Sequence, residues 1–186
     1  SAVQALQSPD TLSRRAGTFY DTTQLRLHLT FPGAYTGTLR LYAVDWETTL
    51  RRQTVTVNDG SGPHSANIST DFSQGAWVSA PITVSAGGSV TISVTPTGTG
   101  AAVISGLFLG GPAPVALPQS QAPQGNWVSS YGLDGYALAA WNGGSDLVSM
   151  PSSSLVLDNG NRYQWSSSPS AVQALQSPDT LSRRAG

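Results

Sequence analysis

The histidines and acidic residues are the first candidates for catalysis, and their surroundings argue against it. The chain has two histidines, His28 and His64, and no cysteine, so a nucleophile–base pair has few possible members. Neither histidine lies in a nucleophile-elbow context. Four of the acidic residues stand beside Gly, Asn or Pro, which is typical of turns, namely Asp10, Asp59, Asp134 and Asp158. We therefore predict a protein that is not an enzyme.

Aromatic and polar residues after position 125 suggest carbohydrate binding instead. Aromatic rings stack on sugar faces, while amides and carboxylates bind hydroxyl groups. The candidate residues are Trp127, Tyr131, Asp134, Tyr136, Trp141, Asn142 and Trp165. The same rings can instead fill the corners of a β-sandwich, and the sequence leaves both roles open. In the binding role, the partner would be an extracellular polysaccharide.

Charge and apolar pattern limit the other partners. Charged residues make up 10% of the chain and the net charge is −1, so no basic surface is available for nucleic acid. Gly and Pro interrupt the apolar stretch Ala101–Leu117, so we expect no membrane insertion. Asp158 and Asn161 offer oxygen ligands for a structural Ca²⁺, but their spacing fits no specific motif and a plain turn is the favoured explanation. We expect no other cofactor.

Short alternating segments must position these residues. In Gln24–Phe31 the leucines fall on one face and the polar residues on the other, and Thr38–Trp46 begins in the same way. A turn cluster separates the two segments, which predicts a hairpin. Further strands are predicted at Thr54–Val57, Trp77–Val84, Ser89–Thr95, Ala101–Leu109, Asn126–Tyr131, Gly135–Trp141, Asp146–Ser149, Ser154–Leu157 and Arg162–Trp165. No helix is expected, so the fold class is an all-β, antiparallel β-sandwich of the jelly-roll kind.

The chain repeats its own beginning. The sequence SAVQALQSPDTLSRRAG occupies residues 1–17 and recurs without change at 170–186, which gives a period of 169 residues. Either the chain is a window on a longer array of near-identical repeats, or it carries an engineered overlap.

Several motifs together resemble one bacterial extracellular module. They are WVSSYGLDGYAL, ALQSP followed by RRAGTFYD, LYAVDWETTLRR and AAVISGLFLGG. The module has a galactose-binding-like β-sandwich fold and occurs beside glycosidases, in surface proteins and in tandem arrays. In that family the Trp-Tyr-Gly part comes first and the FLGG part comes last, whereas here the order is reversed. The resemblance therefore implies that residues 1–111 are the C-terminal part of one module, 112–124 a Pro-rich linker, and 125–186 the N-terminal part of the next.

Because of this permuted order, the two copies of the repeated sequence compete for one strand position. The strands that complete the sandwich can come from residues 125–169 of the same chain or from a neighbouring chain. The segment residues expected to be exchanged are Ser1, Val3, Ala5, Leu6 and Leu12 in the first copy and Ser170, Val172, Ala174, Leu175 and Leu181 in the second. Continuous covalent repeats are the alternative explanation.

Three functions follow from these observations. The first is a non-catalytic repeat unit of an extracellular filament, adhesin or surface array, whose partner is another copy of itself, assembled head to tail by segment exchange. The second is the carbohydrate-binding module of a secreted glycosidase. The third is a designed permutant of that module.

Overall fold

The computed structural model describes residues 2–113, 119–120 and 123–167, and these residues form strands and no helix. All strand pairs are antiparallel, so the predicted all-β sandwich is confirmed. The strands are β1 (Leu6–Gln7), β2 (Arg14–Asp21), β3 (Leu25–Thr30), β4 (Tyr35–Ala43), β5 (Gln53–Asn58), β6 (Pro63–Ile68), β7 (Ala76–Val84), β8 (Ser89–Pro96), β9 (Ala102–Ile104), β10 (Gly106–Leu109), β11 (Gln119–Ser120), β12 (Gly135–Leu138), β13 (Leu147–Ser149), β14 (Ser154–Asn159) and β15 (Asn161–Ser166). Within these ranges no helix is long and apolar enough to cross a membrane.

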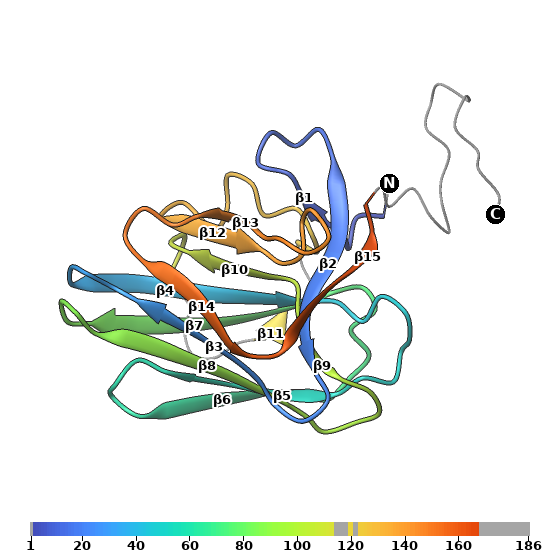
Figure 1. The fold of residues 1–186 in the computed structure, drawn as a ribbon, viewed down its shortest axis with the longest axis horizontal. Coiled ribbons are helices and arrows are strands. Elements are labelled where there is room, and N and C mark those ends of the chain that lie inside the picture. The colour runs from blue at the N-terminus through green and yellow to red at the C-terminus, as the bar shows by residue number, and fades with distance from the viewer. Residues whose placement is uncertain (1, 114–118, 121–122, 168–186) are drawn as a thin grey trace.

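Two large sheets enclose the main core. One has the order β14-β3-β8-β5-β6 and the other β11-β7-β4-β10-β12-β13 (Figure 1). Alternation explains the packing, because Leu25, Leu27 and Leu29 of β3 are fully buried and so are Leu39 and Leu41 of β4. These leucines belong to one apolar cluster between the sheets.

The six-stranded sheet is covered on both faces. Leu39 and Leu41 join the main core, whereas the neighbouring Tyr42 belongs to a second cluster on the other side of the sheet. This second cluster contains Trp77 of β7 and Phe108 of β10, which flank β4. Strand β4 is therefore a continuous buried run in its second half rather than an alternating one.

A smaller sheet crosses the ends of the two large ones. Its central strand is β2, which pairs with β15 along one edge and with β1 and β9 along the other. In Figure 1 its strands β2 and β15 run across the direction of β4, β7 and β8. Tyr20 of β2 and Tyr163 of β15 both lie on this sheet.

Strands from both sides of the Pro-rich stretch share every sheet. Strands β12, β14 and β15 pair with β10, β3 and β2 respectively. The prediction that strands of the second portion (residues 125–186) complete the sandwich begun by the first portion (residues 1–111) is therefore confirmed for the described residues.

Three predicted elements were wrong. Strands β3 and β4 lie in different sheets, so they form no hairpin; their leucine rows face each other across the core instead. The predicted strand Asn126–Tyr131 is a series of turns. The predicted strand Ala101–Leu109 is divided at Ser105, where β9 joins the small sheet and β10 joins the six-stranded one.

Candidate functional site

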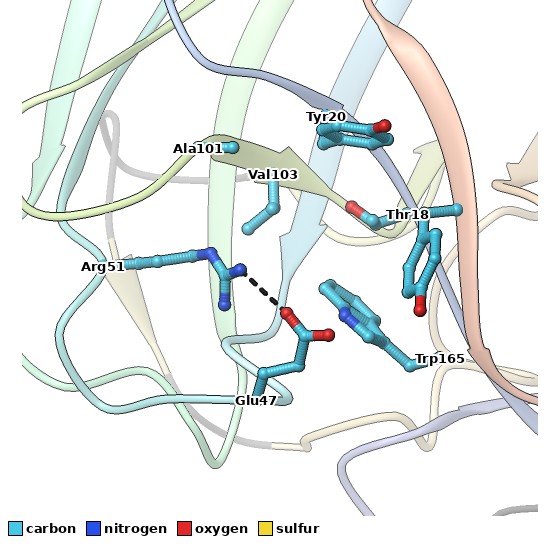
Figure 2. A pocket seen from close by; sticks show the side chains of 8 residues that line it. Thr18, Tyr20, Glu47, Arg51, Ala101, Val103 and Trp165 are labelled. Atoms are coloured by element: carbon cyan, nitrogen blue, oxygen red, sulfur yellow. Dashed lines mark hydrogen bonds and ion pairs between the residues drawn. The ribbon is translucent and has the colours of Figure 1, made fainter.

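One face of the small sheet forms the floor of an open pocket. In the ladder, Thr18 of β2 lies opposite Tyr163 of β15, and Tyr20 of β2 lies opposite Val103 of β9. Residues two apart on a strand share a face, so Thr18 and Tyr20 point the same way. Trp165 lies where a bulge between Gln164 and Ser166 interrupts the ladder, and it lines the same hollow. Figure 2 shows Tyr20, Thr18 and Trp165 around this hollow, which we call the aromatic pocket.

Three aromatic rings line the pocket without stacking face to face. The Tyr20 and Tyr163 rings are 6.4 Å apart, and the Tyr163 and Trp165 rings are 6.3 Å apart, both in edge-on geometry. Tyr163 is 50% exposed, and the other two rings are partly exposed. The rings therefore present apolar surface to solvent.

The loop between β4 and β5, residues 44–52, forms the opposite wall. Its anchor is Asp45, whose fully buried carboxylate accepts hydrogen bonds from the Thr48 hydroxyl at 2.8 Å and the Arg51 backbone N–H at 3.0 Å. The same carboxylate pairs with the Arg51 guanidinium. Burial alone raises the pKa of Asp45, but the bonds from Thr48 and Arg51 outweigh it and hold this pKa below its usual value of 3.8. Asp45 therefore fixes the loop as an anion.

Arg51 and Glu47 supply the polar part of this wall. The Arg51 guanidinium contacts the Glu47 carboxylate at 3.1 Å, and Glu47 is 47% exposed. The Arg51 guanidinium carbon also lies 5.9 Å from the centre of the Trp165 ring. Figure 2 shows the Arg51–Glu47 pair facing the aromatic side chains.

The resulting pocket combines apolar floor and polar rim. It has a volume of about 250 Å³ and is lined by Thr18, Tyr20, Glu47, Arg51, Ala101, Val103, Tyr163 and Trp165. Apolar surface with a few fixed polar groups is the usual composition of a small-molecule site.

The predicted sugar-binding tryptophans divide between two places. Trp165 lies in the aromatic pocket. Trp127 and Trp141 are 3% and 7% exposed and belong to the second apolar cluster. The Trp127 ring packs 5.0 Å from the Phe108 ring, and its indole N–H donates to the Gln7 carbonyl. Their faces are covered, which is the packing role that the sequence left open.

The remaining predicted residues lie outside the aromatic pocket. The Tyr131 ring covers the Arg40 guanidinium at 4.4 Å, and Asp134 accepts a hydrogen bond from the Tyr35 hydroxyl at 2.8 Å. Burial, together with that bond, raises the pKa of Tyr35 above its usual value. Tyr136 packs on the Trp127 ring at 4.8 Å, and Asn142 is exposed in a turn.

Sequence reasoning missed most of the pocket. Tyr20, Tyr163, Glu47 and Arg51 were not among the predicted site residues. One signal was available, because Tyr163 and Trp165 are two residues apart, the spacing that places side chains on one face of a regular strand. The pairing of that strand with β2, which adds Tyr20, could not be read from the sequence alone.

The first copy of the repeated segment occupies a position between the two portions. The Gln7 N–H donates to the Gly125 carbonyl, and the Gly125 N–H donates to the Val3 carbonyl. The Tyr42 hydroxyl donates to the Gln4 carbonyl at 2.7 Å. Residues 2–7 therefore contact the second portion at Gly125 and the first portion at Tyr42.

The predicted exchange residues differ in burial. Ala5 and Leu6 are 0% and 3% exposed, whereas Val3 and Leu12 are 41% and 86% exposed. The others lie outside the described residues, namely Ser1, Ser170, Val172, Ala174, Leu175 and Leu181.

The weak calcium candidate has another partner. The Asp158 carboxylate lies 2.8 Å from Nδ1 of His28, which joins β14 to β3, and Asn161 is exposed at the start of β15. In the described part of the chain, no group of three or more His, Asp or Glu side chains is placed to hold a metal ion.

Comparisons with known proteins give a single distant likeness. No protein-family model and no curated protein matches the chain. Among solved structures, one match is a family 35 carbohydrate-binding module from an environmental isolate, with 25% sequence identity and a TM-score of 0.34. The match covers 54% of this chain and 79% of that module.

Proposed function

We propose that this protein is a non-catalytic, extracellular β-sandwich that binds a neutral oligosaccharide in the aromatic pocket. The observation that carries the proposal is the set of three partly exposed rings, Tyr20, Tyr163 and Trp165, on one side of an open hollow. Sugar rings carry apolar C–H faces that pack on aromatic rings, and their hydroxyls bind charged and amide groups.

The size of the hollow fits part of a saccharide chain. Its volume of about 250 Å³ lies just below the roughly 300–1,000 Å³ of drug-sized sites. Because the pocket is open, a short stretch of one or two sugar rings can sit over the aromatics while the rest of the chain extends beyond it.

The charges in the pocket favour a neutral sugar over an acidic one. Arg51 already pairs with Asp45 and with Glu47, so its charge is balanced within the protein. The exposed carboxylate of Glu47 would repel a uronic acid, whereas it can accept hydrogen bonds from neutral hydroxyls. Neutral gluco-, galacto-, manno- or xylo-oligosaccharides are therefore the expected class.

The same residues argue against glycoside hydrolysis. Hydrolysis of a glycosidic bond generally needs two carboxyl groups on opposite sides of the bond, about 5–10 Å apart. Of the carboxylates near the pocket, Glu47 lines it and is exposed, but Asp45 is fully buried and held by Arg51 and Thr48. The arrangement suits binding.

A calorimetric panel tests the proposal. Neutral gluco-, galacto-, manno- and xylo-oligosaccharides are titrated into the protein, with polygalacturonate as the acidic comparison. We expect binding of at least one neutral sugar and its loss in Trp165→Ala. Tyr136→Ala is the matched control, because it removes a half-buried ring outside the pocket. No binding by any sugar, or binding unaffected by Trp165→Ala, would contradict the proposal.

Head-to-tail assembly by segment exchange is a second candidate, favoured by one specific observation. The first copy of the repeated segment contacts both portions of the sandwich, and residues 170–186 have the same sequence as that copy. In this scheme residues 125–186 of one chain complete the sandwich of the next, with 112–124 as the link, and the copy at 170–186 takes the position that residues 1–17 hold in the next chain. A heterologous interface of this kind gives an open filament or surface array of copies of one protein.

The strand pairs between the two portions can form in the same way within one chain or between two chains. The pairs β10–β12, β3–β14 and β2–β15 are the main contacts to be exchanged, and they keep the same registers whether one chain or two supplies them.

Size-exclusion chromatography with light scattering tests the exchange. The full chain is compared with a version that ends at residue 169. The proposal predicts polymers of the full chain that disappear when 170–186 are removed. Polymers that persist unchanged would rule out exchange through this segment, and a full chain that is only monomeric at all concentrations would do so as well.

A further inference from the structure

The aromatic pocket is built from both portions of the chain. Thr18, Tyr20, Glu47, Arg51, Ala101 and Val103 come from the first portion, and Tyr163 and Trp165 come from the second. Both second-portion residues lie on β15, so the pocket is complete only while β15 is paired with β2.

Strand β15 is an edge strand whose pairing within the described residues is to β2 alone. Within the second portion, the Arg162 guanidinium pairs with Asp146 at 2.8 Å and the Gln164 amide donates to the Ala140 and Trp141 carbonyls. Toward the first portion, the Arg162 guanidinium carbon lies 5.4 Å from the centre of the Phe19 ring, and Trp165 packs against the main core. The β2–β15 ladder is therefore the part of the junction between the portions that lies beside the pocket.

Two side-chain contacts beside the pocket are at the long end of their ranges. The 6.4 Å between the Tyr20 and Tyr163 rings compares with about 4.5–7 Å for aromatic pairs. The 5.9 Å between Arg51 and the Trp165 ring compares with a limit of about 6 Å for cation–π contacts. A ligand that touches both the β15 rings and the first-portion side chains would add contacts across the junction.

We infer that a saccharide in the aromatic pocket holds β15 on β2, and so adds to the contacts that keep the second portion docked and opposes its exchange. The inference rests on the saccharide binding proposed above. A ligand that binds only the closed junction must stabilise that junction, because binding and closure are thermodynamically linked. In an exchanged assembly the same site would be shared by two chains, so the saccharide would hold the chains together.

Hydrogen exchange on the full chain gives a direct test. The probe is the neutral oligosaccharide series of the calorimetric panel, added in turn, and the observable is the exchange rate of the backbone amides of β15. At a free saccharide concentration of a hundred times Kd, the fraction of open junction should fall about 100-fold, and β15 exchange should slow by the same factor. Strand β6 (Pro63–Ile68), the edge of the five-stranded sheet, is the internal control and should not change.

The outcomes separate this inference from the proposed function. Slower exchange in β15 but not in β6, lost in Trp165→Ala, supports the inference. Calorimetric binding with unchanged β15 exchange, or an equal slowing in β6, overturns the inference and leaves saccharide binding intact. No binding by any member of the panel overturns both.

Discussion

Two groups of aromatic residues in this protein have the same chemistry and opposite surroundings. In the second apolar cluster, which we now call the buried aromatic cluster, neighbouring rings have centres 4.7–5.1 Å apart. These rings are Tyr42, Trp77, Phe108 and Trp127. In the aromatic pocket, Tyr20, Tyr163 and Trp165 are 6.3–6.4 Å apart and partly exposed. The indoles of Trp77 and Trp127 each donate to a backbone carbonyl.

The difference lies in what covers each group. The repeated segment closes the buried cluster, since Leu6 belongs to it and Gln7 accepts the bond from Trp127. The pocket has a charged loop on one side and open space on the other. A dense run of aromatic residues in the sequence therefore does not identify a binding site; the exposed ring faces do.

Removal of a ring from the buried aromatic cluster should have the largest effect. Trp127→Ala leaves a cavity next to Phe108 and removes the bond to Gln7, so we expect a loss of about 3–5 kcal/mol in the free energy of unfolding. Urea denaturation followed by circular dichroism measures this loss. Trp165→Ala is the comparison and should cost much less stability. Equal losses would remove the distinction between the two groups.

Release of the loop beside the pocket should have an intermediate effect. Asp45→Asn removes the pairing with Arg51, so we expect a loss of about 2 kcal/mol in stability and weaker saccharide binding. Asp59→Asn is the control, since Asp59 lies in the turn between β5 and β6, accepts a hydrogen bond from the Thr83 N–H of β7 and should not affect binding. Unchanged calorimetric affinity in Asp45→Asn would show that the loop does not form part of the site.

The same carboxylate predicts a pH dependence. The pKa of Asp45 is lower in the folded protein than its usual 3.8, so its contribution to stability is complete above pH 3.8 and is lost as the pH falls through the folded pKa. Saccharide affinity should fall over the same acidic range. The loss of stability and of saccharide affinity at acidic pH should be smaller in Asp45→Asn than in the unaltered protein. Identical losses in both proteins would show that groups other than Asp45 cause them.

The smallest effect is expected at the rim. Glu47→Gln breaks a half-exposed ion pair, which is worth roughly 0–1 kcal/mol, so the melting temperature should hardly change. Loss of the charged acceptor should still weaken saccharide binding by about fivefold, equivalent to about 1 kcal/mol. A large loss of stability with unchanged affinity would make Glu47 a structural residue instead.

The fold was largely predictable because alternation is a local property. The Leu25, Leu27 and Leu29 row predicted a strand with one buried face, and all three are fully buried. Strand β6 was missed because its sequence, PHSANI, is polar and begins with proline, as edge strands often do. The predicted β3–β4 hairpin failed because a one-sided leucine row fits pairing within a sheet and packing between sheets equally well.

The site was much less predictable because exposure is set by distant segments. Trp127 and Trp165 are indistinguishable as residue types, yet residues 6–7 cover the first and leave the second open. Tyr20 and Tyr163 come together only through the β2–β15 ladder, across more than a hundred residues of chain. No local pattern reports such a pairing.

The tryptophan indole N–H signals in a ¹H–¹⁵N NMR titration test the central claim most directly. The chain has five tryptophans, which single Trp→Phe variants assign. On addition of a neutral oligosaccharide that binds in the panel, the Trp165 signal should shift while those of Trp77 and Trp127 stay in place. A shift of the Trp127 signal with an unmoved Trp165 signal would contradict the assignment of the aromatic pocket as the binding site.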